Sequence, residues 1–153
     1  SIKLMITVLI KKLDPSVELP SYKTDGASGM DLKAFVKEPI NLKPQTSCLV
    51  PTGISLAFPS EYEIQIRPRS GLAAKNNISV LNTPGTIDSD YRGELKIILF
   101  NHGNENFMIN KNDRVAQMIL TPTIKMELKE TDELPETIRG EGGFGSTGKW
   151  AIA

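Results

Sequence analysis

Apolar and polar residues alternate with a period close to two along most of the chain. The segments 61–68 (EYEIQIRP) and 123–130 (TIKMELKE) alternate cleanly, as strands with one buried face do. The segments 94–101 and 114–122 are more continuously apolar, which is typical of strands covered on both faces. Further strands are predicted at 2–10, 30–36, 47–50, 53–58, 78–81 and 106–109.

Turn-forming residues separate these runs, and the ten prolines fall mostly between them. Only the segment 70–76 (SGLAAKN) has a helical pattern, for about two turns. Many short strands with turns at near-regular spacing predict an all-β fold, a sandwich, barrel or jelly roll, with one short helix. From about residue 131 an acidic stretch leads into the glycine-rich RGEGGFGSTG (139–148). We therefore predict a single domain, with a β-rich core over 1–130 and a C-terminal arm over 131–153.

Charge and composition narrow the possible partners and location. The 18 Lys and Arg residues balance the 18 Asp and Glu residues, so we expect no nucleic-acid partner and no membrane partner. The apolar segment 2–13 lacks the basic leading region and the cleavage site of a signal peptide, which favours a strand. A lone cysteine, Cys48, excludes an internal disulfide and fits a reducing compartment, so a cytoplasmic location is expected.

The same counts restrict the chemistry. With one His and one Cys, the chain cannot assemble a zinc site, and Ser-His-Asp or Cys-His catalysis is disfavoured. Cys48 is predicted to be a small core residue and His102, in FNHGNEN, to lie in a surface turn. Any reaction must therefore rest on carboxylates, arginines and hydroxyls, with or without an oxygen-bound metal.

The glycine-rich arm matches two phosphate-binding motifs, but neither interpretation holds. GFGSTG (143–148) matches a dinucleotide fingerprint and GFGSTGKW nearly matches a phosphate loop, but both require a following helix that cannot form before residue 153. Glycines still let backbone N–H groups converge on an anion, and Arg139, Ser146 and Thr147 add donors. A disordered tail is the alternative, although it would need neither Arg139 nor Phe144.

Four other segments interrupt the strand pattern. PRSGLA (68–73) is either a helix start capped by Ser70 or an anion clasp. PGTIDSDYRGE (84–94) is predicted to form a hairpin, in which a solvated turn accounts for every charge except Asp88, which directly follows an apolar strand residue. In ASGMDLKA (27–34), Asp31 either caps a turn or serves the site. In DRVAQM (113–118), Gln117 lies in an apolar strand, where its amide needs a partner.

Together these five segments resemble, in order and spacing, the five motifs of the trimeric deoxyuridine triphosphatase family. The resemblance covers nearly the whole chain, from ASGMDL to RGEGGFGSTG. Asn77 and Asn112 stand where many relatives have glycine. Both turns are expected to persist, because Asn tolerates the left-handed conformation better than most residues do.

The resemblance implies a jelly-roll-like β fold, assembled as a homotrimer with three sites at the subunit interfaces. It implies hydrolysis of dUTP to dUMP and pyrophosphate with Mg2+ as cofactor, an activity that limits uracil incorporation into DNA and supplies dUMP for thymidylate synthesis. The alternatives are a dCTP deaminase-like relative of the fold and a non-catalytic regulator that binds dUTP. The NTPGTIDSDYRGE segment and the complete glycine arm argue against the deaminase.

The resemblance also implies roles for individual residues. Asp88 would activate the attacking water, Arg69 would stabilise the phosphates, Tyr91 would exclude a ribose 2′-hydroxyl and Asp31 would hold Mg2+ through water. Asn82 and the backbone of 85–87 would pair with uracil, and the arm would close as a lid donated by another subunit. The full set expected to bind substrate is Arg69, Ser70, Gly71, Asn82, Gly85, Thr86, Ile87, Asp88, Tyr91, Lys96, Gln117, Arg139, Phe144, Gly145, Ser146 and Thr147.

Overall fold

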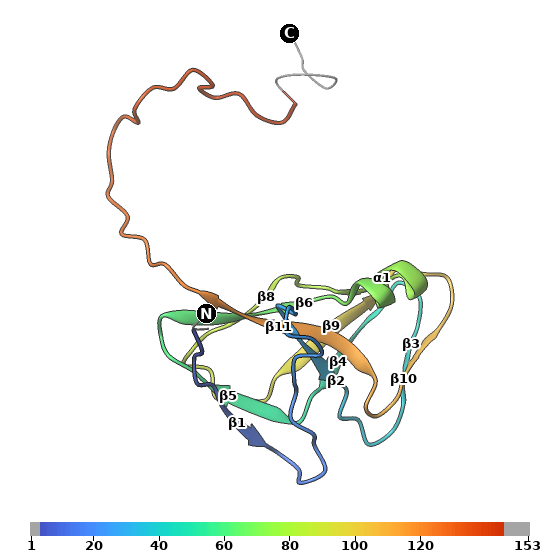
Figure 1. Cartoon of the computed structure of the whole chain (residues 1–153). Coiled ribbons are helices and arrows are strands. Elements are labelled where there is room, and N and C mark those ends of the chain that lie inside the picture. The colour runs from blue at the N-terminus through green and yellow to red at the C-terminus, as the bar shows by residue number, and fades with distance from the viewer. Residues whose placement is uncertain (1–3, 146–153) are drawn as a thin grey trace.

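A computed structural model describes residues 4–145 and shows a mostly antiparallel β protein with one short helix (Figure 1). In chain order the elements are β1 (Leu9–Lys12), β2 (Met30–Lys33), β3 (Ile40–Leu42), β4 (Ser47–Pro51), β5 (Ile54–Ala57), β6 (Tyr62–Arg67), α1 (Ser70–Asn76), β7 (Ile78–Val80), β8 (Gly85–Ile87), β9 (Lys96–Asn101), β10 (Phe107–Ile109) and β11 (Arg114–Pro122). In the described part of the chain, no helix is long and apolar enough to span a membrane.

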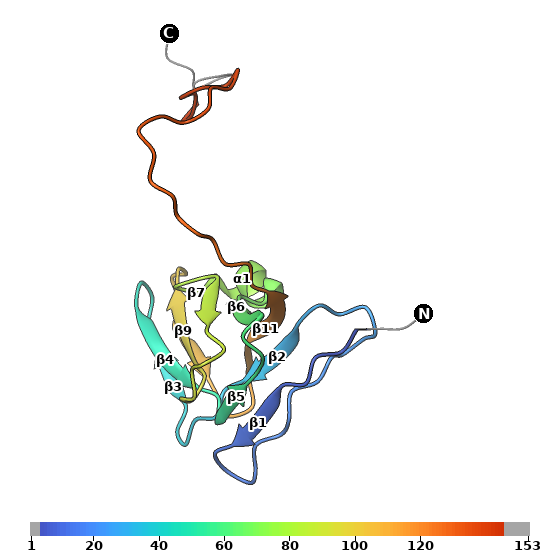
Figure 2. The same ribbon diagram turned by 90° about the vertical axis from the view of Figure 1, so that its left-hand side faces the viewer.

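Two larger sheets enclose the hydrophobic core. One has the strand order β2-β11-β6-β8 and the other β4-β9-β7, while β1-β5 and β10-β3 form two-stranded pairs. Figure 2 shows β4, β9 and β7 on one side of the molecule and β6, β11 and β2 on the other. The period-two pattern of β6 turns Ile64 and Ile66 into the core and leaves Gln65 and Arg67 on the outer face. This outer face carries the polar side chains of the site.

The two asparagine turns form as predicted. Asn77 ends α1 with φ of 57°, and its N–H bonds the carbonyl of Ala73 at 3.2 Å. Asn112 adopts φ of 71° in the turn before β11. The interpretation of Ser70 as the N-cap of α1 is wrong. Arg69 holds the N-cap position without a side-chain cap bond, and Ser70 is the first helical residue.

Three strand predictions need correction. The expected hairpin over 84–94 does not form, because β8 pairs with β6 while β9 pairs with β4 and β7. The expected strand 2–10 is displaced: residues 4–8 lie in no strand, and β1 covers Leu9–Lys12. The strand β3 was not predicted. The segment 123–130 is not a strand. Within residues 4–145 it has no partner strand, and its apolar residues Ile124, Met126 and Leu128 are 81–91% exposed.

After β11 the chain leaves the core. Both views show residues 123–145 extending away from the sheets (Figures 1 and 2). This stretch contains no helix or strand. The fold therefore presents a packed β core and a separate C-terminal arm.

Candidate active site

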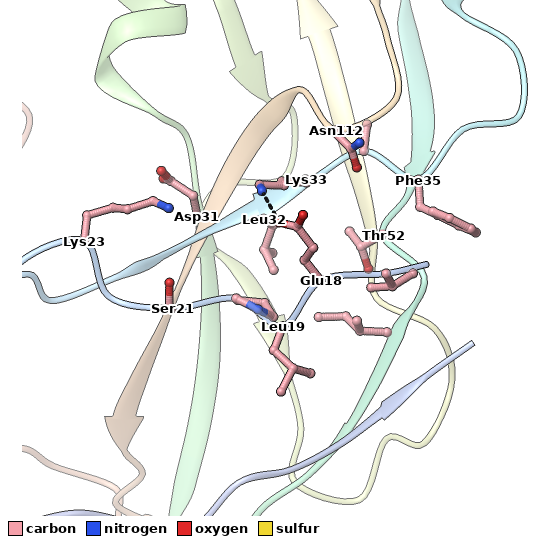
Figure 3. Close-up of a pocket in the computed structure, with 14 residues that line it drawn as sticks. Glu18, Leu19, Ser21, Lys23, Asp31, Leu32, Lys33, Phe35, Thr52 and Asn112 are labelled. Carbon is pink, nitrogen blue, oxygen red and sulfur yellow. Dashed lines mark hydrogen bonds and ion pairs between the residues drawn. The ribbon is translucent and has the colours of Figure 1, made fainter. Parts of the chain in front are cut away.

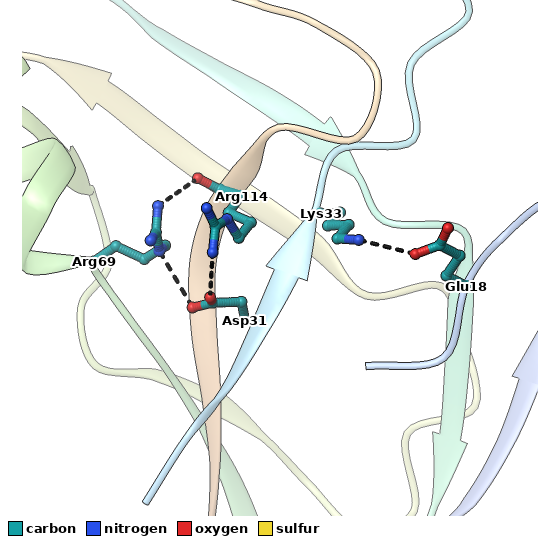
Figure 4. Close-up of polar contacts among 5 residues, drawn as sticks. All are labelled: Glu18, Asp31, Lys33, Arg69 and Arg114. Carbon is teal, nitrogen blue, oxygen red and sulfur yellow. Dashed lines mark hydrogen bonds and ion pairs between the residues drawn. The ribbon is translucent and has the colours of Figure 1, made fainter. Parts of the chain in front are cut away.

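A compact ionic cluster lies where β2, β11 and the start of α1 meet (Figure 4). The Arg69 Nε donates to Asp31 Oδ1 at 3.2 Å, and Arg114 Nη1 lies 3.7 Å from Asp31 Oδ2. Arg69 Nη1 also donates to the backbone carbonyl of Arg114 at 3.3 Å. The side chains of Asp31, Arg69 and Arg114 are 21%, 27% and 49% exposed, so the cluster is open to solvent from one side. Two guanidiniums held close together at a surface offer hydrogen-bond donors that suit an anion.

A β-bulge explains how Arg114 reaches this cluster. In a regular strand, residues three apart point to opposite faces, which would separate Arg114 from Gln117. Here the β11–β2 register shifts between Arg114 and Ala116, so Val115 is an extra residue. Val115 and Ala116 are both buried, and Arg114 returns to the outer face beside Asp31. The sequence pattern alone did not single out Arg114. A strict alternation of faces along the strand places Arg114 opposite Gln117, and it cannot reveal a bulge.

Gln117 completes this half of the site. It pairs in register with Asp31 on one side and Arg67 on the other. Its side-chain Nε2 donates to the carbonyl of Pro68 at 3.0 Å, which supplies the partner expected for this half-buried amide. A Cβ on Gly29 would lie 2.6 Å from Gln117 Oε1 and 3.1 Å from Ile119 Cγ1, so a larger residue there would displace the Gln117 side chain.

The donor set near Asp31 suits a cation that arrives with its own ligands. Within residues 4–145, no group of three or more His, Cys, Asp or Glu side chains could hold a metal ion. A single carboxylate fits Mg2+ that keeps water and is bound mainly by phosphate oxygens. Asp31 therefore fits a hydrated Mg2+ whose other ligands come from a bound phosphate group.

A second half-site surrounds β8. This strand forms the edge of its sheet, since among the described residues it pairs only with β6. An edge strand presents free backbone N–H and C=O groups, which suit recognition of a flat polar ligand edge. Gly85 is buried, and a Cβ there would lie 3.4 Å from Asn82 Nδ2 and 3.2 Å from Ile66 Cβ. Asn82 thus lies against the start of this edge.

The loop after β8 is held by its own contacts. Tyr91 Oη donates to the Glu94 carbonyl at 2.9 Å, and its ring lies over Gly93. Arg92 Nη1 donates to the Ser89 carbonyl at 2.6 Å. The Glu94 carboxylate accepts the N–H of Gly53 at 2.9 Å, so this residue is more than a solvated turn charge.

Asp88 begins this loop and is exposed. Its carbonyl accepts the N–H of Tyr91 at 3.1 Å, but its carboxylate makes no hydrogen bond or ion pair with another residue of the described range 4–145. Lys96, at the start of β9, is also exposed. A free carboxylate at the end of an edge strand is well placed to accept a proton from water.

The arginine cluster and the Asp88 end of β8 lie toward opposite ends of β6, whereas Gly85 pairs with Ile66 near the arginine end. Arg67 pairs with Gln117 at the end of β6 that leads into Arg69, whereas Ile64 pairs with Ile87 near the other end. Asp88 follows Ile87, so it lies level with Glu63. Four residues of strand separate this level from Arg67, a distance of about 13 Å. One chain therefore presents both half-sites but does not bring them together.

The arm residues are also separate from the core. Arg139 Nε donates to the carbonyl of Gly142 at 2.7 Å, within a turn in which Gly140 has φ of 57°. Phe144 is fully exposed and Gly145 has φ of 81°. Ser146 and Thr147 lie outside the described residues. Ser70 and Gly71 begin α1 beside the arginine cluster, and Thr86 and Ile87 lie on the β8 edge.

Other candidate groups do not form a site. A pocket of about 80 Å³ lies beside Asp31, between the segment 17–23 and β2, and is too small for a nucleotide (Figure 3). His102 is exposed and its Nε2 lies 2.7 Å from Ser79 Oγ, in the surface turn that was predicted. Cys48 is only half-buried, and this burial raises the pKa of its thiol, which disfavours the nucleophilic thiolate.

Comparison with known proteins decides the family. A family model described as dUTPase matches residues 16–148. The deoxyuridine 5′-triphosphate nucleotidohydrolase of Treponema denticola is 55% identical over 137 residues, covering 90% of this chain and 95% of that protein. The chain belongs to the dUTPase family.

Further dUTPases support this assignment. The enzyme of Fusobacterium nucleatum is 54% identical over 136 residues, covering 89% of this chain and 93% of that protein. The dUTPase of Staphylococcus bacteriophage 80alpha, solved with dUPNHPP, is 25% identical with a TM-score of 0.82 and covers 93% of this chain and 98% of that one. The dUTPase family comprises hydrolases of nucleotide metabolism, so this chain is an enzyme, and a dCTP deaminase is not favoured.

Proposed function

We propose that this chain hydrolyses dUTP to dUMP and pyrophosphate at sites shared between three copies of itself. The observation that carries the proposal is the pair of half-sites beside β6: two clustered arginines near one end, and near the other an exposed carboxylate with no polar partner among residues 4–145. The activity removes dUTP before a polymerase can incorporate it into DNA and supplies dUMP for thymidylate synthesis.

Asp88 is the proposed general base. Its exposed carboxylate orients a water molecule, accepts its proton and also meets the sugar 3′-hydroxyl. Tyr91, fixed by its bond to the Glu94 carbonyl, lies against the deoxyribose and leaves no room for a 2′-hydroxyl. The free edge of β8, with the Asn82 side chain, pairs with uracil in a slot too narrow for the methyl group of thymine.

The arginine cluster is the proposed triphosphate site. Arg69 and Arg114 bind phosphate oxygens, Ser70 and Gly71 add donors from the start of α1, and Gln117 contributes its amide. Asp31 would hold Mg2+ through water. When bound, Mg2+ neutralises triphosphate charge and favours departure of pyrophosphate.

Shared sites follow from the separation of the half-sites. Asp88 lies about 13 Å from the level of Arg67 along β6. A neighbouring copy can therefore bring its arginines to the phosphates beside Asp88 more readily than the same chain can. The row of Ile124, Met126 and Leu128 is almost fully exposed and alternates with polar residues, as does a segment that adds a strand to another chain. A cyclic trimer satisfies both features and closes the assembly.

The arm completes the site in this proposal. Arg139 meets the terminal phosphate, Phe144 stacks on uracil, and Gly145, Ser146 and Thr147 close over the phosphates. Arg139 and Phe144 are exposed in the single chain, so closing brings them to a neighbour's nucleotide. We place the enzyme in the cytoplasm, because its one cysteine fits a reducing compartment.

Pyrophosphate release from dUTP, dTTP, dCTP and UTP tests the proposal. We expect rapid release from dUTP and at least about a hundredfold lower kcat/KM for the other three, the discrimination that unpaired polar groups and steric exclusion supply. Ammonia release from dCTP would instead identify a deaminase. Binding of dUTP without pyrophosphate release would identify a non-catalytic regulator.

A further inference from the structure

The segment between β1 and β2 contains the one position in the chain where an aspartate or asparagine directly precedes glycine, Asp25–Gly26. A backbone nitrogen that follows an aspartate can attack the carboxyl carbon of that side chain. Glycine hinders this attack least, because it has no Cβ and its backbone turns freely. Asp25–Gly26 is therefore the pair in this sequence that is chemically best suited to a backbone rearrangement.

The fold leaves this pair unrestrained. Asp25 and Gly26 are exposed and form the centre of a turn, in which the N–H of Ala27 donates to the carbonyl of Thr24 at 3.2 Å. Among residues 4–145, the Gly26 N–H donates no hydrogen bond, and the Asp25 carboxylate makes neither a hydrogen bond nor an ion pair. A Cβ on Gly26 would meet no atom within 4 Å, so nothing packs against the turn at this point. Both reacting groups are free to approach each other.

Other aspartates differ in at least one of these respects. Asp31 lies within β2, is paired with two guanidiniums and precedes the buried Leu32. The Asp113 carboxylate accepts the N–H of Asn110 at 2.7 Å. Asp88 is exposed, but the residue after it is a serine, whose Cβ hinders attack by the backbone nitrogen.

We propose that Asp25–Gly26 is a site of spontaneous isomerisation to isoaspartate in the folded protein. The Gly26 nitrogen bonds to Asp25 Cγ, and its proton leaves with a carboxyl oxygen as water, which gives a cyclic succinimide. Water then opens the ring. Attack at Cγ restores aspartate, whereas attack at the backbone carbonyl carbon of Asp25 leaves the peptide running through Cγ and frees the α-carboxylate. One water is lost and one is gained, so the reaction needs no other reactant.

The product is a modified surface turn on an intact core. Isoaspartate adds one methylene to the backbone at a point where nothing packs against the chain, so the melting temperature should stay unchanged. Its freed α-carboxylate lies in an exposed segment, where a carboxyl methyltransferase that uses S-adenosylmethionine can reach it. The inference goes beyond the proposed function and does not depend on it.

Incubation of the full-length chain in heavy-oxygen water at near-neutral pH tests the proposal. Each ring opening incorporates one heavy oxygen, and an isoaspartate-specific carboxyl methyltransferase with labelled S-adenosylmethionine counts the isomerised chains. Digestion with trypsin in ordinary water then releases residues 24–33 as one peptide that holds both Asp25 and Asp31. Fragmentation of this peptide should locate the heavy oxygen at Asp25 and none at Asp31.

The rate distinguishes a reaction of the folded chain from one that requires unfolding. A synthetic peptide of residues 22–33 has no fold to restrain it and serves as the reference. Isoaspartate should form in the full-length chain within about threefold of the peptide rate, because an unrestrained turn opens at almost no cost in free energy. A slower rate in the full-length chain would show that the fold protects the pair and would overturn the proposal.

Gly26→Ala is the matched variant. The new methyl group meets no atom within 4 Å, so the fold should persist, but it hinders ring closure and should slow isoaspartate formation by about tenfold or more. Asp25→Glu keeps the charge and should abolish the signal, because its longer side chain would have to close a larger ring. Isoaspartate forming in either variant as fast as in the parent chain would exclude Asp25–Gly26 as the site.

Discussion

At the scale of single residues, Asp88 carries the proposed chemistry. Its side chain is exposed and has no polar partner within residues 4–145, so nothing in the described chain competes with a water molecule for it. The sequence anticipated this position from an acid that directly follows an apolar strand residue. It could not anticipate that β8 is an edge strand, because strand pairing depends on residues distant in sequence.

Asp88→Asn should lower kcat for dUTP by about 10²-fold or more, the typical loss for a general base. The dissociation constant for dUPNHPP should change little, because the amide keeps the shape of the side chain. Asp90→Asn, two residues along the same exposed loop, is the control and should retain near-normal turnover. Comparable rates for the two variants would remove Asp88 from the role of base.

Gly93→Ala should weaken discrimination between dUTP and UTP. A Cβ at this position would overlap the ring of Tyr91, which would have to leave its place against the loop. The ratio of kcat/KM for dUTP to that for UTP should therefore fall in Gly93→Ala, as it should in Tyr91→Ala. Tyr91→Phe keeps the ring and should keep the ratio. A ratio unchanged in Gly93→Ala and Tyr91→Ala would place the sugar gate elsewhere.

At the scale of elements, the local sequence pattern predicted the features that depend on nearby residues and missed those that depend on sheet register. The helix over 70–76, the strand over 114–122 and the turns at Asn77 and Asn112 depend on nearby residues and formed as expected. The bulge at Val115 and the pairing of β8 with β6 depend on sheet register, which no local pattern encodes. Arg114 was missed for that reason.

Gly29→Ala tests the close approach of β2 to β11. The new methyl group would lie 2.6 Å from Gln117 Oε1, 3.1 Å from Ile119 Cγ1 and 3.3 Å from the carbonyl oxygen of Met118. We expect a loss of about 1–3 kcal/mol in the free energy of unfolding, as for other overpacked sites. Affinity for tripolyphosphate should also fall, because Gln117 is displaced. Chemical denaturation and calorimetry measure both quantities.

Gly26→Ala is the matched control for that substitution. It lies in the same segment, and a Cβ there would meet no atom within 4 Å. Its stability and anion affinity should stay within experimental error of the parent chain. If Gly29→Ala behaves in the same way, the contact between Gly29 and Gln117 does not constrain the phosphate half-site.

At the scale of the whole molecule, the groups of the proposed site are spread over separate parts of the single chain. Its half-sites are apart, its arm is away from the core, and an alternating apolar segment has no partner among the described residues. The sequence predicted a strand at 123–130 because apolar and polar residues alternate there. The alternation does not reveal which strand this segment pairs with. The core and arm division at about residue 130 remains a prediction, although within residues 4–145 the last strand already ends at Pro122.

Mixing two inactive variants tests whether arms cross between subunits. One chain is truncated after Ile138 and lacks Arg139 and Phe144, and the other carries Asp88→Asn. If each site combines Asp88 of one subunit with the arm of another, roughly a quarter of the sites in random trimers are intact. Pyrophosphate release by the refolded equal mixture should therefore recover to about that fraction. No recovery, with mixed trimers confirmed by mass, would show that each arm closes on its own subunit.

Because the arm is exposed, the enzyme can lose its activity without losing its folded core. Unpaired, accessible backbone is what proteases cleave most readily, and Arg139 offers a trypsin site within it. The buried core of the described chain lies between Val17 and Ala116, so a cut in the arm removes none of it. Nicked protein should keep its melting temperature while its dUTP hydrolysis disappears. The lifetime of the activity is then set by protease access to the arm, and a bound nucleotide that closes the arm extends it.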